Sequence, residues 1–164
     1  MFALLYGAGL RRAEAIGLDV ADVDTATGEL RIRNGKGRKE RLAYVPIGGR
    51  RALEAWSSYR GSEPGPLLCP VRRETVVHRR LTAQAIYYVC KRRARQAGIP
   101  AFSPHDLRRT FITSLLEADA DLLSVQNLAG HVLVATTARY DRRGERAKRK
   151  ASDLLAVPYG GRPP

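Results

Sequence analysis

A histidine and an arginine three residues apart, His105 and Arg108, have the side-chain types and the spacing for phosphate chemistry. Helix start signals surround them: Ser103 is a candidate N-cap, Pro104 takes the first helical position, and Asp106 completes a capping box. Both side chains then share one helix face, and the histidine lies in the first turn, where free N–H groups favour an anion. Arginine offers a bidentate fork to phosphate oxygens, and histidine moves a proton near neutral pH. Alone, this pair also fits two surface residues without a catalytic task.

The net charge points to a polyanionic partner. The 164 residues include 29 Lys and Arg against 16 Asp and Glu, a net charge of +13 that repels itself unless a polyanion binds. The excess lies in three blocks, Arg31 to Arg41, Lys91 to Arg95 and Arg142 to Lys150. We expect double-stranded DNA, although a basic surface that favours solubility, a ribosomal protein and a membrane-surface protein share this charge. The candidate DNA contacts are Arg31, Arg33, Arg38, Lys39, Arg41, Lys91, Arg92 and Arg93.

The sequence gives little support to membrane or metal binding. No apolar run approaches the length of a membrane span, and the first residues lack the basic region of a secretory signal. Cys69 and Cys90 are too few for a disulfide scaffold, and no Cys/His spacing matches a zinc site. We therefore expect no metal, no cofactor and no membrane, and a cytoplasmic location, associated with the bacterial nucleoid or encoded by a mobile element.

Further polar motifs stand on either side of the His-x-x-Arg pair. They are Leu10-Arg11-Arg12-Ala13-Glu14, Asn34-Gly35-Lys36-Gly37, Leu128-Ala129-Gly130-His131, and Tyr140, nine residues after His131. In order and spacing this set resembles the catalytic domain of the tyrosine recombinase (phage integrase) family, from its first arginine to its nucleophile.

The resemblance implies that Tyr140 is the nucleophile of a DNA strand transferase and forms a covalent 3′-phosphotyrosine. Arg11 and Arg108 match the two arginines that bind the non-bridging phosphate oxygens, and His131 matches a further donor. Preorganised positive charge of this kind stabilises a pentavalent phosphorus without metal or ATP. An amphipathic surface tyrosine is the alternative for Tyr140, but none of the other tyrosines follows the Gly-His element.

Three more residues match supporting positions of the family. A phenol keeps its proton at neutral pH, and His105 is the natural acceptor for it. Lys36 matches the hairpin lysine and suits the role of acid for the 5′ oxygen, with a plain phosphate contact as the alternative. Glu14 matches the acidic residue and is expected to orient Arg11.

The implied activity is DNA cleavage and rejoining in site-specific recombination or integration, carried out by a homo-oligomer that forms a tetrameric synapse on DNA. Two alternatives stay open: strand relaxation like that of a type IB topoisomerase, and a non-catalytic DNA-binding remnant of an integrase. We expect residues 1–157 to be the catalytic domain, without the family's N-terminal DNA-clamping domain and first helical turns, and residues 158–164 to be a flexible tail.

The elements that must position these residues are mainly helical. The predicted fold class is α+β, a mostly α-helical domain with a small antiparallel three-stranded β-sheet. A short helix from Thr136 or Thr137 is expected to carry Tyr140, and after Lys150 only residues 151–157 have a helical pattern. The other predicted helices cover 10–16, 50–59, 82–97, 103–118 and 121–129, and the strands cover 21–24, 29–34 and 40–45, with Lys36 at a hairpin tip.

Overall fold

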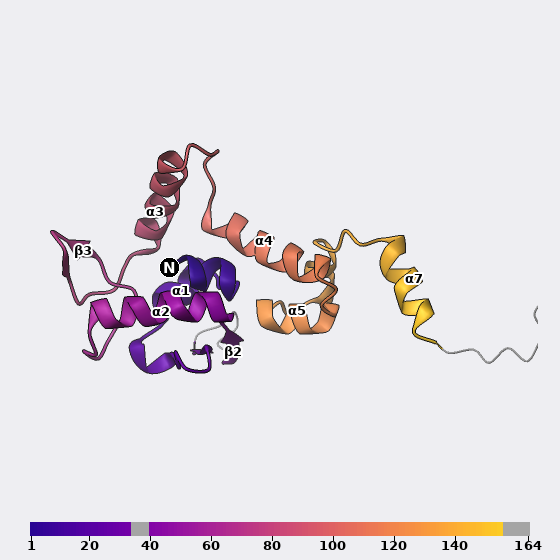
Figure 1. Cartoon of the computed structure of the whole chain (residues 1–164), viewed down its shortest axis with the longest axis horizontal. Coiled ribbons are helices and arrows are strands. Elements are labelled where there is room, and N and C mark those ends of the chain that lie inside the picture. The colour runs from indigo at the N-terminus through magenta and orange to yellow at the C-terminus, as the bar shows by residue number, and fades with distance from the viewer. Residues whose placement is uncertain (34–39, 156–164) are drawn as a thin grey trace, which may run out of the picture.

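The computed structural model describes residues 1–33 and 40–155. It confirms the mostly helical α+β class, with α4 beside α5 in the centre of the molecule and α7 standing apart at one end (Figure 1). The chain begins with a single π-helical turn, η1, and ends its described part with α7. The elements are η1 (Ala3–Gly7), α1 (Arg12–Gly17), η2 (Val20–Asp22), β1 (Glu29–Ile32), β2 (Arg41–Tyr44), α2 (Ile47–Arg60), β3 (Val71–Arg72), β4 (Thr75–Val76), α3 (Ala83–Gln96), α4 (Pro104–Glu117), α5 (Leu122–Ala129), α6 (Val134–Ala138) and α7 (Glu145–Asp153).

Two clusters of buried apolar side chains form the core. The larger one joins η1, α1, the β1–β2 pair, α2 and α3. The smaller one, Phe111, Ile112, Leu116, Val125 and Ala129, joins α4 to α5. Gly9 connects the two parts: it has a positive φ of 61°, and a Cβ there would collide with the Phe111 ring. Only glycine lets the backbone before α1 approach α4 so closely.

The predicted three-stranded sheet is reduced to two strands. β1 and β2 pair antiparallel, with Ile32 opposite Arg41. The prediction of a strand at 21–24 is wrong. The helical turn η2 occupies residues 20–22, and of this segment Val23 alone forms a β-bridge, an isolated one to Leu30. Asp22 explains the difference, since its carboxylate accepts a hydrogen bond from the Asp19 N–H at 3.0 Å and closes a turn instead. The expected hairpin tip with Lys36 lies outside the described residues.

The helices that carry the site begin and end where their caps predict. At the start of α4 the Ser103 N–H and hydroxyl both donate to Asp106 Oδ2, at 2.9 and 2.7 Å. At α5, Asp121 accepts from the Ser124 N–H at 2.8 Å, and Gly130 ends the helix in the left-handed conformation. These caps fix the positions of His105 and Arg108 on α4 and of His131 just after the end of α5.

The C-terminal helices differ from the prediction. α6 begins at Val134 and ends at Ala138, so that Tyr140 follows the helix and is not part of it. α7 covers Glu145–Asp153, largely within the basic block that was not expected to be helical. It buries no residue, and its apolar residues are two alanines, so it lacks the large apolar side chains by which a packed helix is recognised. The short β3–β4 hairpin was not predicted either.

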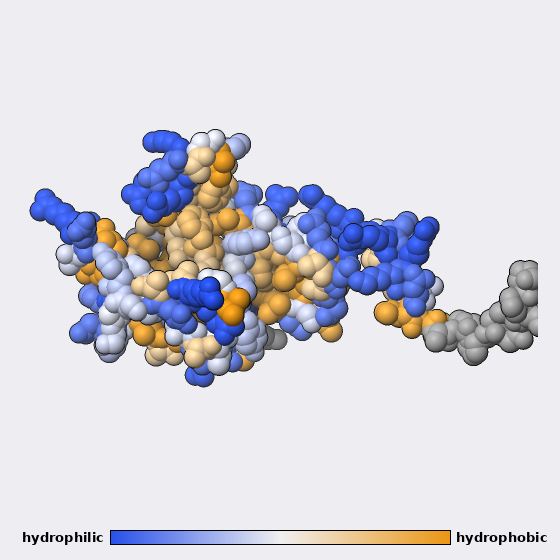
Figure 2. Space-filling model, in the orientation of Figure 1, coloured by the Kyte–Doolittle hydropathy of each residue, from blue (hydrophilic) through white to orange (hydrophobic). Residues whose placement is uncertain are grey.

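The surface is strongly hydrophilic along α7 and on the outer part of α3 (Figure 2). An apolar patch lies at the far end of α7, where Leu154 and Leu155 are 83% and 74% exposed. Among the described helices, none combines the length and the apolar character that a bilayer span requires.

Candidate active site

A pocket of about 790 Å³ brings together predicted site residues from distant parts of the chain. Arg11 reaches it from the start of α1, His105 and Arg108 from α4, His131 from the end of α5, and Tyr140 from the segment after α6. Arg12 and Tyr87, which were not singled out from the sequence, also line it. The pocket therefore combines three guanidinium groups, two imidazoles and two phenols in a single cavity.

Arg108 is the most deeply placed of these cations. Arg108 is only 4% exposed, and its guanidinium donates to the carbonyl oxygens of Gly9 and Ala129. Burial, and next the nearby charge of Arg11, lower the pKa of Arg108 to about 10. It still carries its charge at neutral pH, in a position that two backbone carbonyls fix.

Arg11 is held by Glu14 and by the end of α5. Nη1 of Arg11 donates to Oε1 of Glu14 at 2.7 Å, and Nη2 donates to the Gly130 carbonyl at 2.8 Å. The Arg11 backbone N–H donates to Oε2 of Glu14 at 2.8 Å. Burial by itself raises the pKa of Glu14, but the charge of Arg41 and the hydrogen bonds and charge of Arg11 outweigh it and lower the pKa. Glu14 therefore holds both the guanidinium and the backbone N–H of Arg11.

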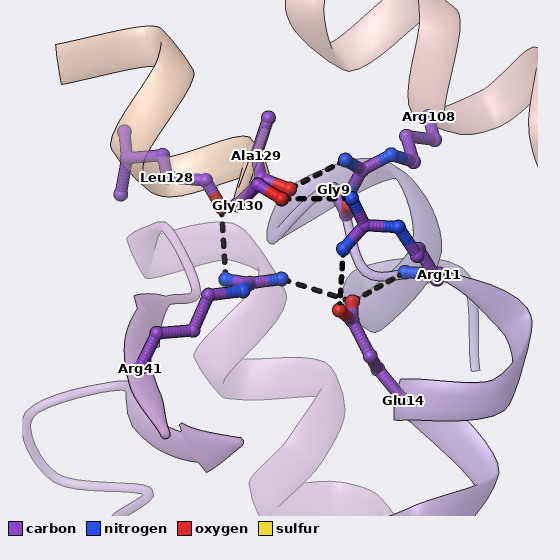
Figure 3. A network of polar contacts seen from close by, with 8 residues as sticks. All are labelled: Gly9, Arg11, Glu14, Arg41, Arg108, Leu128, Ala129 and Gly130. Carbon is purple, nitrogen blue, oxygen red and sulfur yellow. Dashed lines mark hydrogen bonds and ion pairs between the residues drawn. The ribbon is translucent and has the colours of Figure 1, made fainter. Parts of the chain in front are cut away.

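Arg41, an expected DNA contact, points inward instead. Its Nη2 donates to Oε2 of Glu14 and its Nη1 to the Leu128 carbonyl, both at 2.9 Å. We call Arg11, Arg41, Arg108 and Glu14 the arginine cradle (Figure 3). Three consecutive carbonyls, at residues 128 to 130, each accept from a different arginine of this cradle. They form the C-terminal end of α5, where helix carbonyls lack intrahelical partners and the helix dipole favours cations.

His131 and Tyr140 face each other across the pocket, with ring centroids 6.3 Å apart and planes tilted by 24°. Nδ1 of His131 lies 2.9 Å from Oγ1 of Thr137, a fully buried residue of α6. Burial, and next the charges of Arg108 and Arg11, lower the pKa of His131 to about 4. The ring is therefore neutral at physiological pH, and the Thr137 hydroxyl engages one of its two nitrogens, Nδ1, and leaves Nε2 free of this contact.

The other candidate DNA contacts among the described residues lie on α3, on β1 and just after β1. Lys91, Arg92 and Arg93 are exposed on α3, with Nζ of Lys91 4.8 Å from the centroid of the pocket-lining Tyr87 ring. Arg31 is exposed on β1, and Arg33 is exposed but pairs with Asp22 at 2.6 Å. Lys36, Arg38 and Lys39 lie outside the described residues. Within the described ranges, His, Cys, Asp and Glu side chains form no group of three or more that could hold a metal ion.

Sequence reasoning missed the contributions of Arg41 and Thr137. For Arg41 the alternation along β2 gives no usable signal, because the large apolar side chains of Leu42 and Tyr44 are the exposed ones and positions 41, 43 and 45 are the more buried. For Thr137 no local pattern distinguishes it from the adjacent Thr136.

Comparisons with known proteins agree with this geometry. A model described as the phage integrase family matches residues 1–146. The tyrosine recombinase XerD of Mycobacterium leprae (strain TN) is 42% identical over 149 residues, which cover 85% of this chain and 46% of that protein. The tyrosine recombinase XerA of Thermococcus kodakarensis is 36% identical over 150 residues, covering 92% of this chain and 52% of that protein. The chain thus spans about half the length of these relatives.

Solved structures show the same fold. The crystal structure of XerA recombinase superposes with a TM-score of 0.75 at 28% identity, over 96% of this chain and 57% of that chain. The XerH site-specific recombinase, in a pre-cleavage complex with its difH substrate, gives a TM-score of 0.70 at 25% identity, over 95% of this chain and 46% of that chain. These matches confirm the expected catalytic-domain fold.

Proposed function

Because this chain belongs to the phage integrase family, we propose that it cleaves and rejoins DNA strands in site-specific recombination through a 3′-phosphotyrosine at Tyr140. The observation that carries the proposal is the pocket in which Arg11, Arg108, His105, His131 and Tyr140 converge. Their residue types supply a nucleophile, proton carriers and positive charge to one phosphate.

The two arginines neutralise the charge of the transition state. The guanidinium groups of Arg11 and Arg108 fork onto the non-bridging oxygens of the scissile phosphate, and the neutral His131 donates an N–H to the same group. Each preorganised donor of this kind is worth about 3 to 4 kcal/mol of barrier. The carbonyl contacts of both arginines keep this charge in place before DNA arrives.

The covalent step exchanges one phosphate ester for another. Oη of Tyr140 attacks phosphorus, its proton passes to His105, and the bond from phosphorus to the 5′ oxygen breaks. Lys36 gives a proton to that 5′ oxygen, which leaves as a free hydroxyl. The phosphotyrosine retains the bond energy, so that the same hydroxyl, or one from another duplex, reverses the attack without ATP.

Double-stranded DNA is the proposed substrate, and a homo-oligomer on DNA the proposed working unit. The net charge of +13 and the exposed basic side chains of β1 and α3 support the first, as does the related XerH, solved with its difH substrate. Residues 1–157 act as the catalytic domain in this proposal.

The test is covalent capture by Tyr140. A nicked duplex, with a sequence selected by the protein itself from a randomised pool, is incubated with the protein and analysed by denaturing electrophoresis. The unaltered protein should form an adduct, Tyr140→Phe should bind equally well and form none, and Tyr59→Phe should behave as wild type, since its hydroxyl bonds to Glu74 away from the pocket.

Each alternative function has its own outcome in this assay. A duplex that is bound but never captured by the unaltered protein favours the non-catalytic remnant. If the protein forms the adduct and relaxes supercoiled DNA, but transfers no strand between two duplexes, the result favours a topoisomerase. An adduct that persists in Tyr140→Phe places the nucleophile on another tyrosine.

A further inference from the structure

Arg41 makes an unusual set of contacts for a residue in a basic hairpin. It is the first residue of β2, far from Arg11 and Arg108 in sequence, yet its side chain is only 15% exposed. One guanidinium nitrogen contacts a carboxylate and another contacts a backbone carbonyl, each at 2.9 Å. Unlike Arg11 and Arg108, which are held in the same way but line the pocket, Arg41 is turned away from it.

One partner of Arg41 is shared with a pocket cation, and the other lies next to two carbonyls that hold pocket cations. Oε2 of Glu14 accepts from Arg41, which leaves Oε1 of the same carboxylate to hold the guanidinium of Arg11. The Leu128 carbonyl stands next to the Ala129 and Gly130 carbonyls that hold Arg108 and Arg11 (Figure 3). Arg41 therefore contacts the two supports of the pocket arginines and does not itself line the pocket.

The backbone at the end of α5 is shaped around this side chain. Gly130 has a φ of +62°, and a Cβ built there would lie 2.8 Å from Cδ of Arg41 and closer still to its Nε. The Arg41 side chain thus fills the space beside the residue whose carbonyl accepts from Arg11.

We propose that Arg41 is a positioning residue that fixes the direction of the Arg11 guanidinium toward the scissile phosphate, through Glu14 and the end of α5. This inference rests on the proposed strand-cleavage function. It assigns Arg41 to the support of the pocket and not to the DNA-contacting face of the hairpin.

The experiment compares two scissile groups. One nicked duplex carries the ordinary phosphodiester, and the other carries a methylphosphonate, in which a neutral methyl group replaces one charged oxygen. A residue that acts by aligning positive charge matters less for the neutral group, whereas a general loss of folded protein slows both reactions equally. The quantity measured is therefore the ratio of the two single-turnover cleavage rates, phosphodiester over methylphosphonate.

Arg11→Met should lower this ratio about 100-fold, the usual effect of one lost preorganised donor. Arg41→Met should lower it in the same direction by about tenfold, because Arg11 stays but loses its fixed direction. Arg41→Lys keeps the charge but has no fork for two acceptors, so that it should recover only part of the ratio. If Arg41→Met folds poorly, Arg41→Lys still tests the proposal.

Arg80→Met is the matched control. Arg80 likewise joins a carboxylate, Asp19, to the backbone carbonyls of Ile16 and Leu18, but away from the pocket. Arg80→Met should leave the ratio of the two cleavage rates unchanged, even if it lowers the stability of the folded protein.

Three results overturn the inference. An unchanged ratio in Arg41→Met, with both rates reduced alike, reduces Arg41 to a stabilising residue. A normal ratio with a shallower salt dependence of DNA binding makes it a phosphate contact. An unaltered protein that forms no adduct on either substrate removes the proposed function itself, and the inference with it.

Discussion

The arginine cradle and the segment that carries Tyr140, the proposed nucleophile, are held in very different ways. In the cradle, Arg108 and Glu14 are 4% and 6% exposed, and every guanidinium has a backbone carbonyl as acceptor. In residues 131–155, by contrast, Thr137 is the one buried residue, and α7 contributes no burial at all. The molecule therefore fixes the arginines of the proposed site firmly, and holds the segment around Tyr140 with little burial beyond the packing of Tyr140 against the α4–α5 cluster.

Physical chemistry favours this division. Charges that stabilise a transition state are most effective when they need no reorganisation at the moment of reaction. A nucleophile, however, must move toward phosphorus and away again, and low local burial allows such motion. Arg143 provides one attachment next to the tyrosine, since it bonds both Asp141 and the Ala120 carbonyl.

The largest effect is expected when the arginine cradle is loosened at Arg108. Arg108→Lys keeps a positive charge but cannot donate to Gly9 and Ala129 and still fork onto phosphate. We expect single-turnover cleavage to fall about 1000-fold, near the upper range for one preorganised donor. Arg51→Lys, an exposed change on α2, is the control. A loss of less than about tenfold contradicts a fixed cradle.

A smaller disturbance of the same region is Gly130→Ala. An alanine at this position is strained by the positive φ, and its Cβ also collides with the Arg41 side chain. We expect about 1 kcal/mol of lost stability from the backbone and about 30-fold slower cleavage from displaced arginines. Gly98→Ala has a similar φ of +65° but open space around the Cβ, so it should lose stability only. Equal cleavage rates in the two variants remove the steric argument.

The nucleophile segment is tested at Thr137. Thr137→Val keeps the shape of the side chain and removes the hydroxyl that contacts Nδ1 of His131. We expect cleavage to slow about tenfold, because the imidazole loses the hydroxyl that holds its ring in place, with a stability loss of about 1 kcal/mol. Thr137→Ser should restore most of the rate. If the serine variant is as slow as the valine variant, packing and not the hydrogen bond explains the effect.

The smallest expected effect concerns pH and stability without DNA. The pKa of His131 is lowered to about 4 in the folded protein, so between about pH 6.5 and pH 4 the unfolded chain binds the proton more readily. Stability should therefore fall as the pH decreases through this window. Urea unfolding at pH 7 and pH 5 measures the difference, and His131→Gln should reduce it. An identical pH dependence in the variant assigns the effect to other groups.

The sequence was a good guide wherever a local signal decides the structure. The capping residues of α4 and the glycine at the end of α5 predict where His105, Arg108 and His131 stand, and the family resemblance predicts which side chains meet. The inward direction of Arg41 depends on partners as distant as Leu128, 87 residues away, and no local rule supplies that contact. α7 was missed for a different reason, because its apolar residues are two alanines among charged side chains, too few and too small to indicate a packed helix.

The three successive carbonyls at the end of α5 have a consequence for insertions and deletions. Since residues 128, 129 and 130 each serve a different arginine, adding or removing one residue within α5 turns these carbonyls by about 100° around the helix axis. All three arginines then lose their acceptors together. A length change in the connection between Tyr140 and α7 displaces no such set, so that tolerated length variants should gather there and avoid α5.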